Sequence, residues 1–179
     1  MNKKMMCAVV MGCASLVGVS AVSAQGMGQG SDQDKQFLMT ASLSDYTEIT
    51  FSQLAVQKAT NPQVKAYAQK MITDHQTLEQ NMKPFADQMS VTPASSLDSM
   101  HQQLYDQLNG LSGADFDKQY MSDMDTDHHK SLDAFKTEAS TTTDAKLKPT
   151  VKKGEKVVAQ HTEMADKMVK KMGGTTSGM

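Results

Sequence analysis

The chain has 179 residues, of which 39% are hydrophobic, and its formal net charge is −2. This length suits one domain, and the mild acidity argues against nucleic-acid binding, which needs a basic face. All 18 basic residues are lysines, so bidentate arginine contacts to phosphate or carboxylate are excluded.

Residues 1–24 are predicted to be an export signal. Lys3 and Lys4 precede an apolar run that ends in the small residues Val22-Ser23-Ala24, which suit signal peptidase. We expect cleavage after Ala24 and an exported protein of the periplasm or cell envelope. The alternative is that the segment is kept as a membrane anchor.

Both cysteines, Cys7 and Cys13, lie within this predicted signal. The mature chain would then have no disulfide and no disulfide partner. An exported protein without disulfides must be stabilised by its core or by a metal. Losing Lys3 and Lys4 would change the formal charge from −2 to −4.

Residues 25–33 are rich in glycine and glutamine and are predicted to be disordered. A long amphipathic helix is expected from about residue 34 to 59, followed by Asn61-Pro62, which ends it and starts a second helix that runs to about residue 89. The apolar residues of this second helix alternate in steps of four and three, and Pro84 is expected to kink or shorten it.

A shorter helix is predicted to start at a Ser95 or Ser96 cap and to run through Leu108. Two further long helices are expected at about residues 113–139 and 145–172, followed by a disordered tail at 173–179. No segment alternates with the period of a strand. The sequence therefore predicts one all-α domain over residues 34–172, a four-helix bundle with an extra short helix between the second and third long helices.

A polar residue interrupts the apolar face of each long helix: Glu48, His75, His128 and His161. Glu48 and His75 lie 13 and 14 residues from Asn61, and His128 and His161 lie 16 and 17 residues from Asp144. At about 1.5 Å per residue, each pair is level along its helical hairpin. We therefore expect the four side chains to meet in one layer near mid-height.

Three imidazoles and a carboxylate suit a single transition metal ion such as iron, zinc or copper. Asp74, Asp125 and Asp127 are near enough in sequence to hold these ligands or to add to them. The paired Glu-x-x-His motifs of di-iron bundles are missing, which favours one metal over two. The alternative is a hydrogen-bonded polar layer without metal, which fixes the register of the helices.

Other polar features have simpler interpretations. Met71, Met124 and Met164 lie about one turn from the histidines, which would suit copper(I), but methionine is also an adaptable core filler. His129 and His101 are expected at the surface. The lysines of the last helix are expected to form a solvated face, with contact to an anionic envelope surface or an envelope protein as an alternative.

Motifs in both halves of the chain carry a family resemblance. The first half contains Phe37-Leu38-x-x-Ala41, Glu48, Leu54-Ala55, Asn61-Pro62-x-Val64-Lys65 and Met71-x-x-Asp74-His75. The second contains Leu111-Ser112-Gly113-x-x-Phe116-Asp117-x-x-Tyr120, Asp127-His128, His161 and Ala165. In these elements the sequence resembles an exported bacterial family, domain of unknown function 4142. The resemblance implies a ferritin-like bundle and an envelope location, but no activity.

Two functions follow as expectations. The first is a metal-binding bundle for storage, buffering or stress protection, and the second is a non-catalytic envelope interaction module whose Glu/His layer is structural. A redox enzyme of the ferritin-like kind is disfavoured by the missing Glu-x-x-His pairs. The sequence contains no nucleophilic triad, phosphate loop or nucleotide fingerprint.

Overall fold

The computed structural model describes residues 30–178, and this part of the chain contains five helices and no strand. The helices are α1 (Asp32–Lys58), α2 (Pro62–Gln88), α3 (Ser99–Gly110), α4 (Gly113–Thr141) and α5 (Leu147–Lys171). The predicted all-α fold is confirmed. The predicted export signal, and most of the N-terminal segment expected to be disordered, lie outside the described residues.

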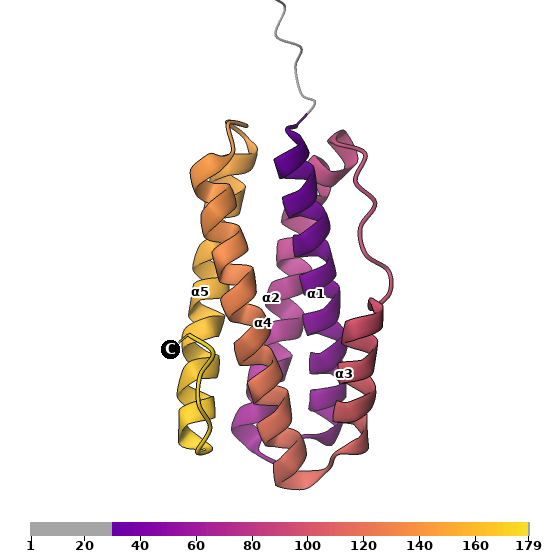
Figure 1. The fold of residues 1–179 in the computed structure, drawn as a ribbon, viewed down its shortest axis with the longest axis vertical. Helices are drawn as coiled ribbons and strands as arrows, with labels where there is room; N and C mark the ends of the chain where they lie inside the picture. Colours follow the sequence, from indigo (N-terminus) through magenta and orange to yellow (C-terminus); the bar gives the residue numbers. More distant parts are fainter. Residues whose placement is uncertain (1–29, 179) are drawn as a thin grey trace, which may run out of the picture.

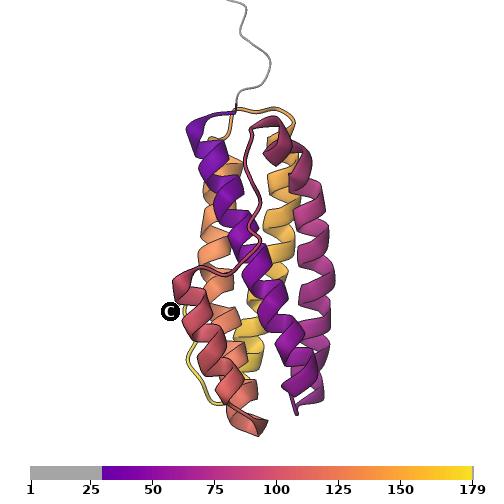
Figure 2. The same cartoon turned by 90° about the vertical axis from the view of Figure 1, so that its right-hand side faces the viewer.

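The four long helices form a bundle of two antiparallel hairpins, α1–α2 and α4–α5 (Figure 1). α1 packs against α4, and α2 packs against α5. Residues 89–98 run back along the outside of the bundle to α3, so that α4 starts at the end of the bundle opposite to the end of α2 (Figure 2). One such long crossover is the topology of ferritin-like bundles, with α3 as the extra helix in the crossover.

The helix ends follow local capping chemistry. Ser31 and Asp34 form a capping box at the start of α1, and Asn61 caps α2 before Pro62. The cap of α3 is Asp98, whose carboxylate accepts from the His101 N–H at 2.8 Å, and so neither Ser95 nor Ser96 caps this helix.

Pro84 does not shorten α2, because the helix continues to Gln88. A proline inside a helix removes the hydrogen bond to the carbonyl four residues earlier, here that of Gln80. Gln80 is exposed, so water can satisfy that carbonyl.

The hydrophobic core consists of two clusters. One lies at the α1–α2 turn and includes Phe51, Tyr67, Phe116 and Tyr120. The other lies at the opposite end and includes residues such as Phe37, Met82, Phe135 and Val158. The polar layer predicted from the sequence separates them.

Gly154 allows α5 to pack closely against α4. A Cβ atom at this position would lie 2.4 Å from Cε1 of Phe135, which is itself buried edge-on against Phe37. Lys152 and Lys153, which precede this glycine, point to the exposed side of the helix. The lysine-rich start of α5 therefore still contributes a buried face.

Residues 173–178 form a tail that follows α5. Gly173 has a φ of 81°, which turns the chain after α5. The tail then runs back along the bundle, and the backbone N–H of Ser177 donates to Asp125 Oδ2 at 2.7 Å. This contact joins the tail to a buried carboxylate 52 residues away in sequence.

Two buried carboxyl groups, Asp34 and Glu138, meet where α1 packs against the end of α4. Asp34 Oδ1 and Glu138 Oε1 have no hydrogen-bond donor among the described residues unless one carboxyl carries a proton. Burial and the hydrogen bond to Asp34 raise the pKa of Glu138 to about 7. Burial raises the pKa of Asp34, but hydrogen bonds to Glu138, Thr142 and Ser31 lower it by a larger amount. The pKa of Asp34 therefore lies below its ordinary value.

We expect the Glu138 proton to make stability fall as pH rises. Between its ordinary pKa of 4.5 and about 7, folded Glu138 keeps a proton that the unfolded chain has lost, so the free energy of unfolding decreases across this range. Glu138→Gln retains the donor and removes the titration. Urea unfolding at about pH 5.5 and about pH 8 measures how much free energy of unfolding is lost between the two. This loss should be about 2 kcal/mol larger in the wild type than in the variant. Equal losses would contradict the shared proton.

Candidate metal centre

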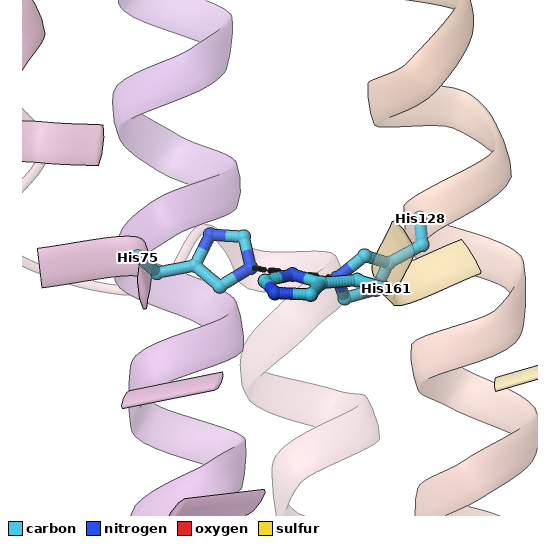
Figure 3. Close-up of side chains that lie close together, drawn as sticks. All are labelled: His75, His128 and His161. Atoms are coloured by element: carbon cyan, nitrogen blue, oxygen red, sulfur yellow. Dashed lines mark hydrogen bonds between the residues drawn. The ribbon is translucent and has the colours of Figure 1, made fainter. Parts of the chain in front are cut away.

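Three histidines from three helices converge in the middle of the bundle (Figure 3). His75 of α2, His128 of α4 and His161 of α5 are each exposed by 1% or less. Nε2 of His75 lies 3.4 Å from Nε2 of His128 and 3.3 Å from Nδ1 of His161. The layer predicted from helix heights thus brings three imidazole nitrogens to one point.

The separations of these nitrogens match those of metal ligands. A zinc–imidazole bond is about 2.0–2.1 Å long, so two corners of a tetrahedral site lie roughly 3.4 Å apart. The two observed separations are 3.4 and 3.3 Å. A metal ion could therefore be bound with little movement of the helices.

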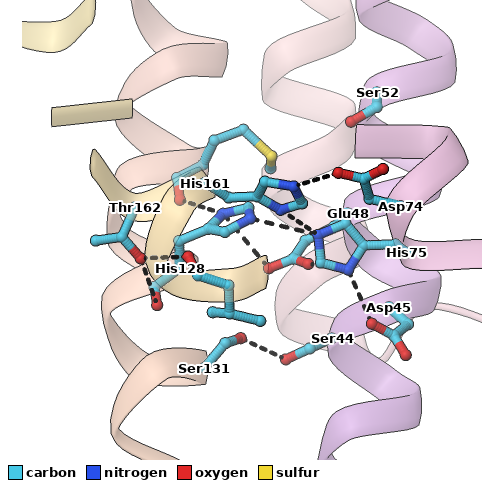
Figure 4. A network of polar contacts seen from close by, with 12 residues as sticks. Ser44, Asp45, Glu48, Ser52, Asp74, His75, His128, Ser131, His161 and Thr162 are labelled. Atoms are coloured by element: carbon cyan, nitrogen blue, oxygen red, sulfur yellow. Dashed lines mark hydrogen bonds and ion pairs between the residues drawn. The ribbon is translucent and has the colours of Figure 1, made fainter. Parts of the chain in front are cut away.

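Hydrogen bonds determine which nitrogen of each ring carries a proton. The outward nitrogen of each ring lies 2.8 Å from an oxygen acceptor: His75 Nδ1 from Asp45, His128 Nδ1 from the Met124 carbonyl, and His161 Nε2 from Asp74 (Figure 4). Carbonyl and carboxylate oxygens only accept, so each outward nitrogen donates. In neutral imidazoles the three inward nitrogens then present lone pairs to one another. Such an arrangement needs a cation, either a metal ion or a proton, at its centre.

Glu48 belongs to the layer but does not point at this centre. Its Oε2 lies 2.9 Å from Nδ1 of His75, and its Oε1 lies 3.6 Å from Nδ1 of His128. Both are outward nitrogens, and the geometry of neither contact is that of a well-formed hydrogen bond. In this arrangement Glu48 contacts two imidazoles on the side away from the centre. Its side chain would have to rotate to become a metal ligand, as the sequence predicted.

The electrostatics favour a positive charge in the layer. Burial raises the pKa of Glu48, but His128 and His75 lower it more strongly, to about 2. For His75, burial lowers the pKa, but Glu48 and Asp45 raise it to about 10. Burial and the other two histidines lower the pKa of His161 to about 4. Glu48 is therefore an anion in the core, which favours a positive charge among the imidazoles around it.

The other predicted aspartates lie in different places. Asp74, with 26% of its side chain exposed, contacts His161 and also Lys70 at 2.7 Å. Asp125 is turned toward His129 and the C-terminal tail, and Asp127 lies 3.6 Å from Lys130. Only Asp74 therefore reaches the histidine layer by direct contact.

Asp45, which is 4% exposed, also belongs to the layer but was not predicted from the sequence. It stands three residues before Glu48 on α1, so both carboxylates project from one ridge of the helix toward His75. The Asp-x-x-Glu spacing was the signal that could have identified it.

Asp74 connects the buried layer to the surface. It lines a groove of about 420 Å³ between α2 and α5, together with Lys70, Lys153 and Gln160. Burial raises the pKa of Asp74, but Lys70 and His161 lower that pKa below its ordinary value. Asp74 is therefore an anion in the lining of the groove. Asp74 thus joins this groove to His161, which it contacts at 2.8 Å.

The fold and the buried layer define a ferritin-like helical bundle with a polar centre formed by histidines. The chain belongs to the family Domain of unknown function (DUF4142), whose model matches residues 19–168. The resemblance found in the sequence is thereby confirmed. No curated protein matches the sequence.

Two solved structures from another family have similar folds. The "putative secreted protein DUF305" from Streptomyces coelicolor superposes with a TM-score of 0.67 at 13% identity, covering 81% of this chain and 96% of that chain. A DUF305 fragment from Deinococcus radiodurans gives a TM-score of 0.61 at 12% identity, covering 82% and 96%. At these identities the likeness shows the fold alone. None of the described helices has the length and apolar character needed to cross a membrane.

Proposed function

We propose that this protein is an exported bundle of the periplasm or cell envelope that binds one transition metal ion through His75, His128 and His161. The single observation that carries the proposal is the convergence of three inward imidazole nitrogens. The outward nitrogen of each ring donates a hydrogen bond, so the inward nitrogen carries a free lone pair. Metal-bound histidines have this pattern, in which the second nitrogen donates to a carboxylate or carbonyl that orients the ring.

The donor set favours zinc or copper over iron. All three inward atoms are imidazole nitrogens, which are borderline ligands that suit zinc and copper, and no carboxylate lies among them. Iron would be favoured if Glu48 rotated into the centre, because its oxygen is a harder ligand.

The burial of the centre supports metal storage, buffering or protection against metal stress. The three histidines are 0–1% exposed, so a bound ion has no open face for a substrate. Exchange of the ion would pass Asp74 and the groove between α2 and α5.

A second candidate is an envelope interaction module in which the layer holds no metal. It is favoured by the raised pKa of His75, about 10, since a proton on its Nε2 can donate to a neighbouring imidazole. The carboxylates of Asp45 and Glu48 then balance the imidazolium, and the layer serves to fix helix register.

Metal content separates the two candidates. Mature, untagged protein purified from the periplasm is expected to contain zinc, copper or iron, and His75→Ala/His161→Ala is expected to lose one equivalent of it. His101→Ala, which removes a histidine of α3, should change nothing, and circular dichroism should confirm that the double variant is still helical. Cobalt(II) bound to the wild type should show the visible spectrum of tetrahedral coordination. Metal-free protein that resists loading and still unfolds cooperatively would favour the second candidate.

A further inference from the structure

A second group of metal-ligating side chains lies outside the histidine layer. Asp125 and His129 stand one turn apart on α4, and Asp166 faces them from α5. His129 Nε2 lies 3.0 Å from Asp166 Oδ1 and 3.8 Å from Asp125 Oδ1. The three candidate ligand atoms all lie within 4.8 Å of one another.

Asp125 indicates that this cluster is more than a surface ion pair. The residue is 1% exposed, and its Oδ1 has no hydrogen-bond partner among the described residues unless the Asp125 and Asp166 carboxyl groups share a proton. Its Oδ2 accepts from the Ser177 N–H at 2.7 Å, which fixes the carboxylate with Oδ1 toward His129. A buried acceptor without a partner costs about 1–3 kcal/mol, and a bound cation would remove that cost.

The geometry and donor types suit a divalent transition metal. Bonds of about 2.1 Å place neighbouring ligands roughly 3.0 Å apart in an octahedral site and 3.4 Å apart in a tetrahedral one. The observed separations of 3.0 and 3.8 Å lie close to this range, and the partly exposed Asp166 side chain can adjust. Two carboxylates and one imidazole suit Zn²⁺ or Mn²⁺. His129 and Asp166 side chains are 26% and 30% exposed, which leaves room for water ligands.

The C-terminal tail covers one side of the cluster. Besides the bond to Asp125, the Ser177 hydroxyl lies 3.0 Å from that of Thr126. Gly178 lies against the His129 ring, since a Cβ there would be 2.4 Å from Cε1 of His129. The tail thus orients the buried carboxylate and limits access of solvent to the imidazole.

We infer that Asp125, His129 and Asp166 form a second binding site for a divalent transition cation, open to water and bordered by the C-terminal tail. The site is independent of the histidine layer, because no ligand is shared. It has the features of an exchangeable site, whereas the core centre is closed.

Zinc titration by calorimetry tests this site in the His75→Ala/His161→Ala background, where the core centre is disabled. One equivalent of zinc is expected to bind, with an affinity that falls by more than about 10-fold on adding His129→Ala or Asp166→Asn. The matched control is His101→Ala, which removes the His101–Asp98 pair of α3 at 2.8 Å.

If the background variant fails to fold, the same titration in otherwise wild-type protein should show that His129→Ala removes one of two zinc equivalents. Absence of saturable zinc binding, or binding that His129→Ala leaves unchanged, would overturn the inference and leave an ordinary ion pair. An equal loss in His101→Ala would overturn it as well, because binding would then be nonspecific.

Discussion

Stripping the metal from the core centre is expected to lower the melting temperature by about 8–16 °C. A ligand that binds only the folded state at about 1,000 times its dissociation constant stabilises that state by about 4 kcal/mol. For a domain of about 150 residues, each kcal/mol corresponds to about 2–4 °C. His75, His128 and His161 come from three helices, so the unfolded chain cannot reproduce the site.

The size of this shift should increase with pH. In the metal-free protein the proton of His75 supplies the central cation, and burial, Glu48 and Asp45 together set its pKa at about 10. Because the pKa of His75 in the folded protein lies above its ordinary value of 6.5, this stabilisation is complete below pH 6.5 and is lost as pH rises toward 10. A bound metal replaces the proton, so the loaded protein does not lose that contribution.

Thermal unfolding with one equivalent of zinc and with a chelator, at about pH 7 and about pH 9.5, measures both effects. The gap between the two melting temperatures should be larger at the higher pH. His75→Ala/His129→Ala/His161→Ala, which disables both proposed sites, should show no gap at either pH. Identical melting of chelated and loaded wild type would contradict a metal in the histidine layer.

The helices and the height of the layer could be predicted because both depend on spacing along the chain. Apolar residues in steps of three and four define the buried face of α2, and the positions of Asn61 and Asp144 place His75 and His161 at similar depth. These relations hold whichever way the crossover connects α2 to α4.

The directions of the side chains could not be predicted in the same way. Glu48 lies on the buried face, but its rotation toward the outward nitrogens depends on neighbouring rings from α2 and α4. The role of Asp125 depends on a tail contact 52 residues away in sequence. Such contacts are set by tertiary packing, which periodicity does not encode.

Truncating Glu48 is expected to be the most destabilising single change in the metal-free layer. Glu48→Ala leaves the buried His75 imidazolium with Asp45 as its one carboxylate contact, at 2.8 Å. Removing one partner of a buried ion pair costs about 3–5 kcal/mol. Urea unfolding in the presence of a chelator measures this loss, and Glu48→Gln, which keeps the shape and one acceptor oxygen, should lose less. A Glu48→Ala variant within about 1 kcal/mol of wild type would show that the layer holds no such charge pair.

Replacing the whole layer is expected to have the opposite effect on stability. The combined variant carries Asp45→Ala, Glu48→Leu, His75→Leu, His128→Leu and His161→Leu. Exchanging a buried ionic cluster for apolar side chains of similar volume is often neutral or stabilising by about 1–4 kcal/mol. The variant should therefore remain a helical bundle that unfolds at equal or higher urea concentration, yet bind no metal in the core. In this variant the two hydrophobic clusters on either side of the layer could join into one core. The stability of the folded bundle would then not depend on having Glu48 and three histidines at this height.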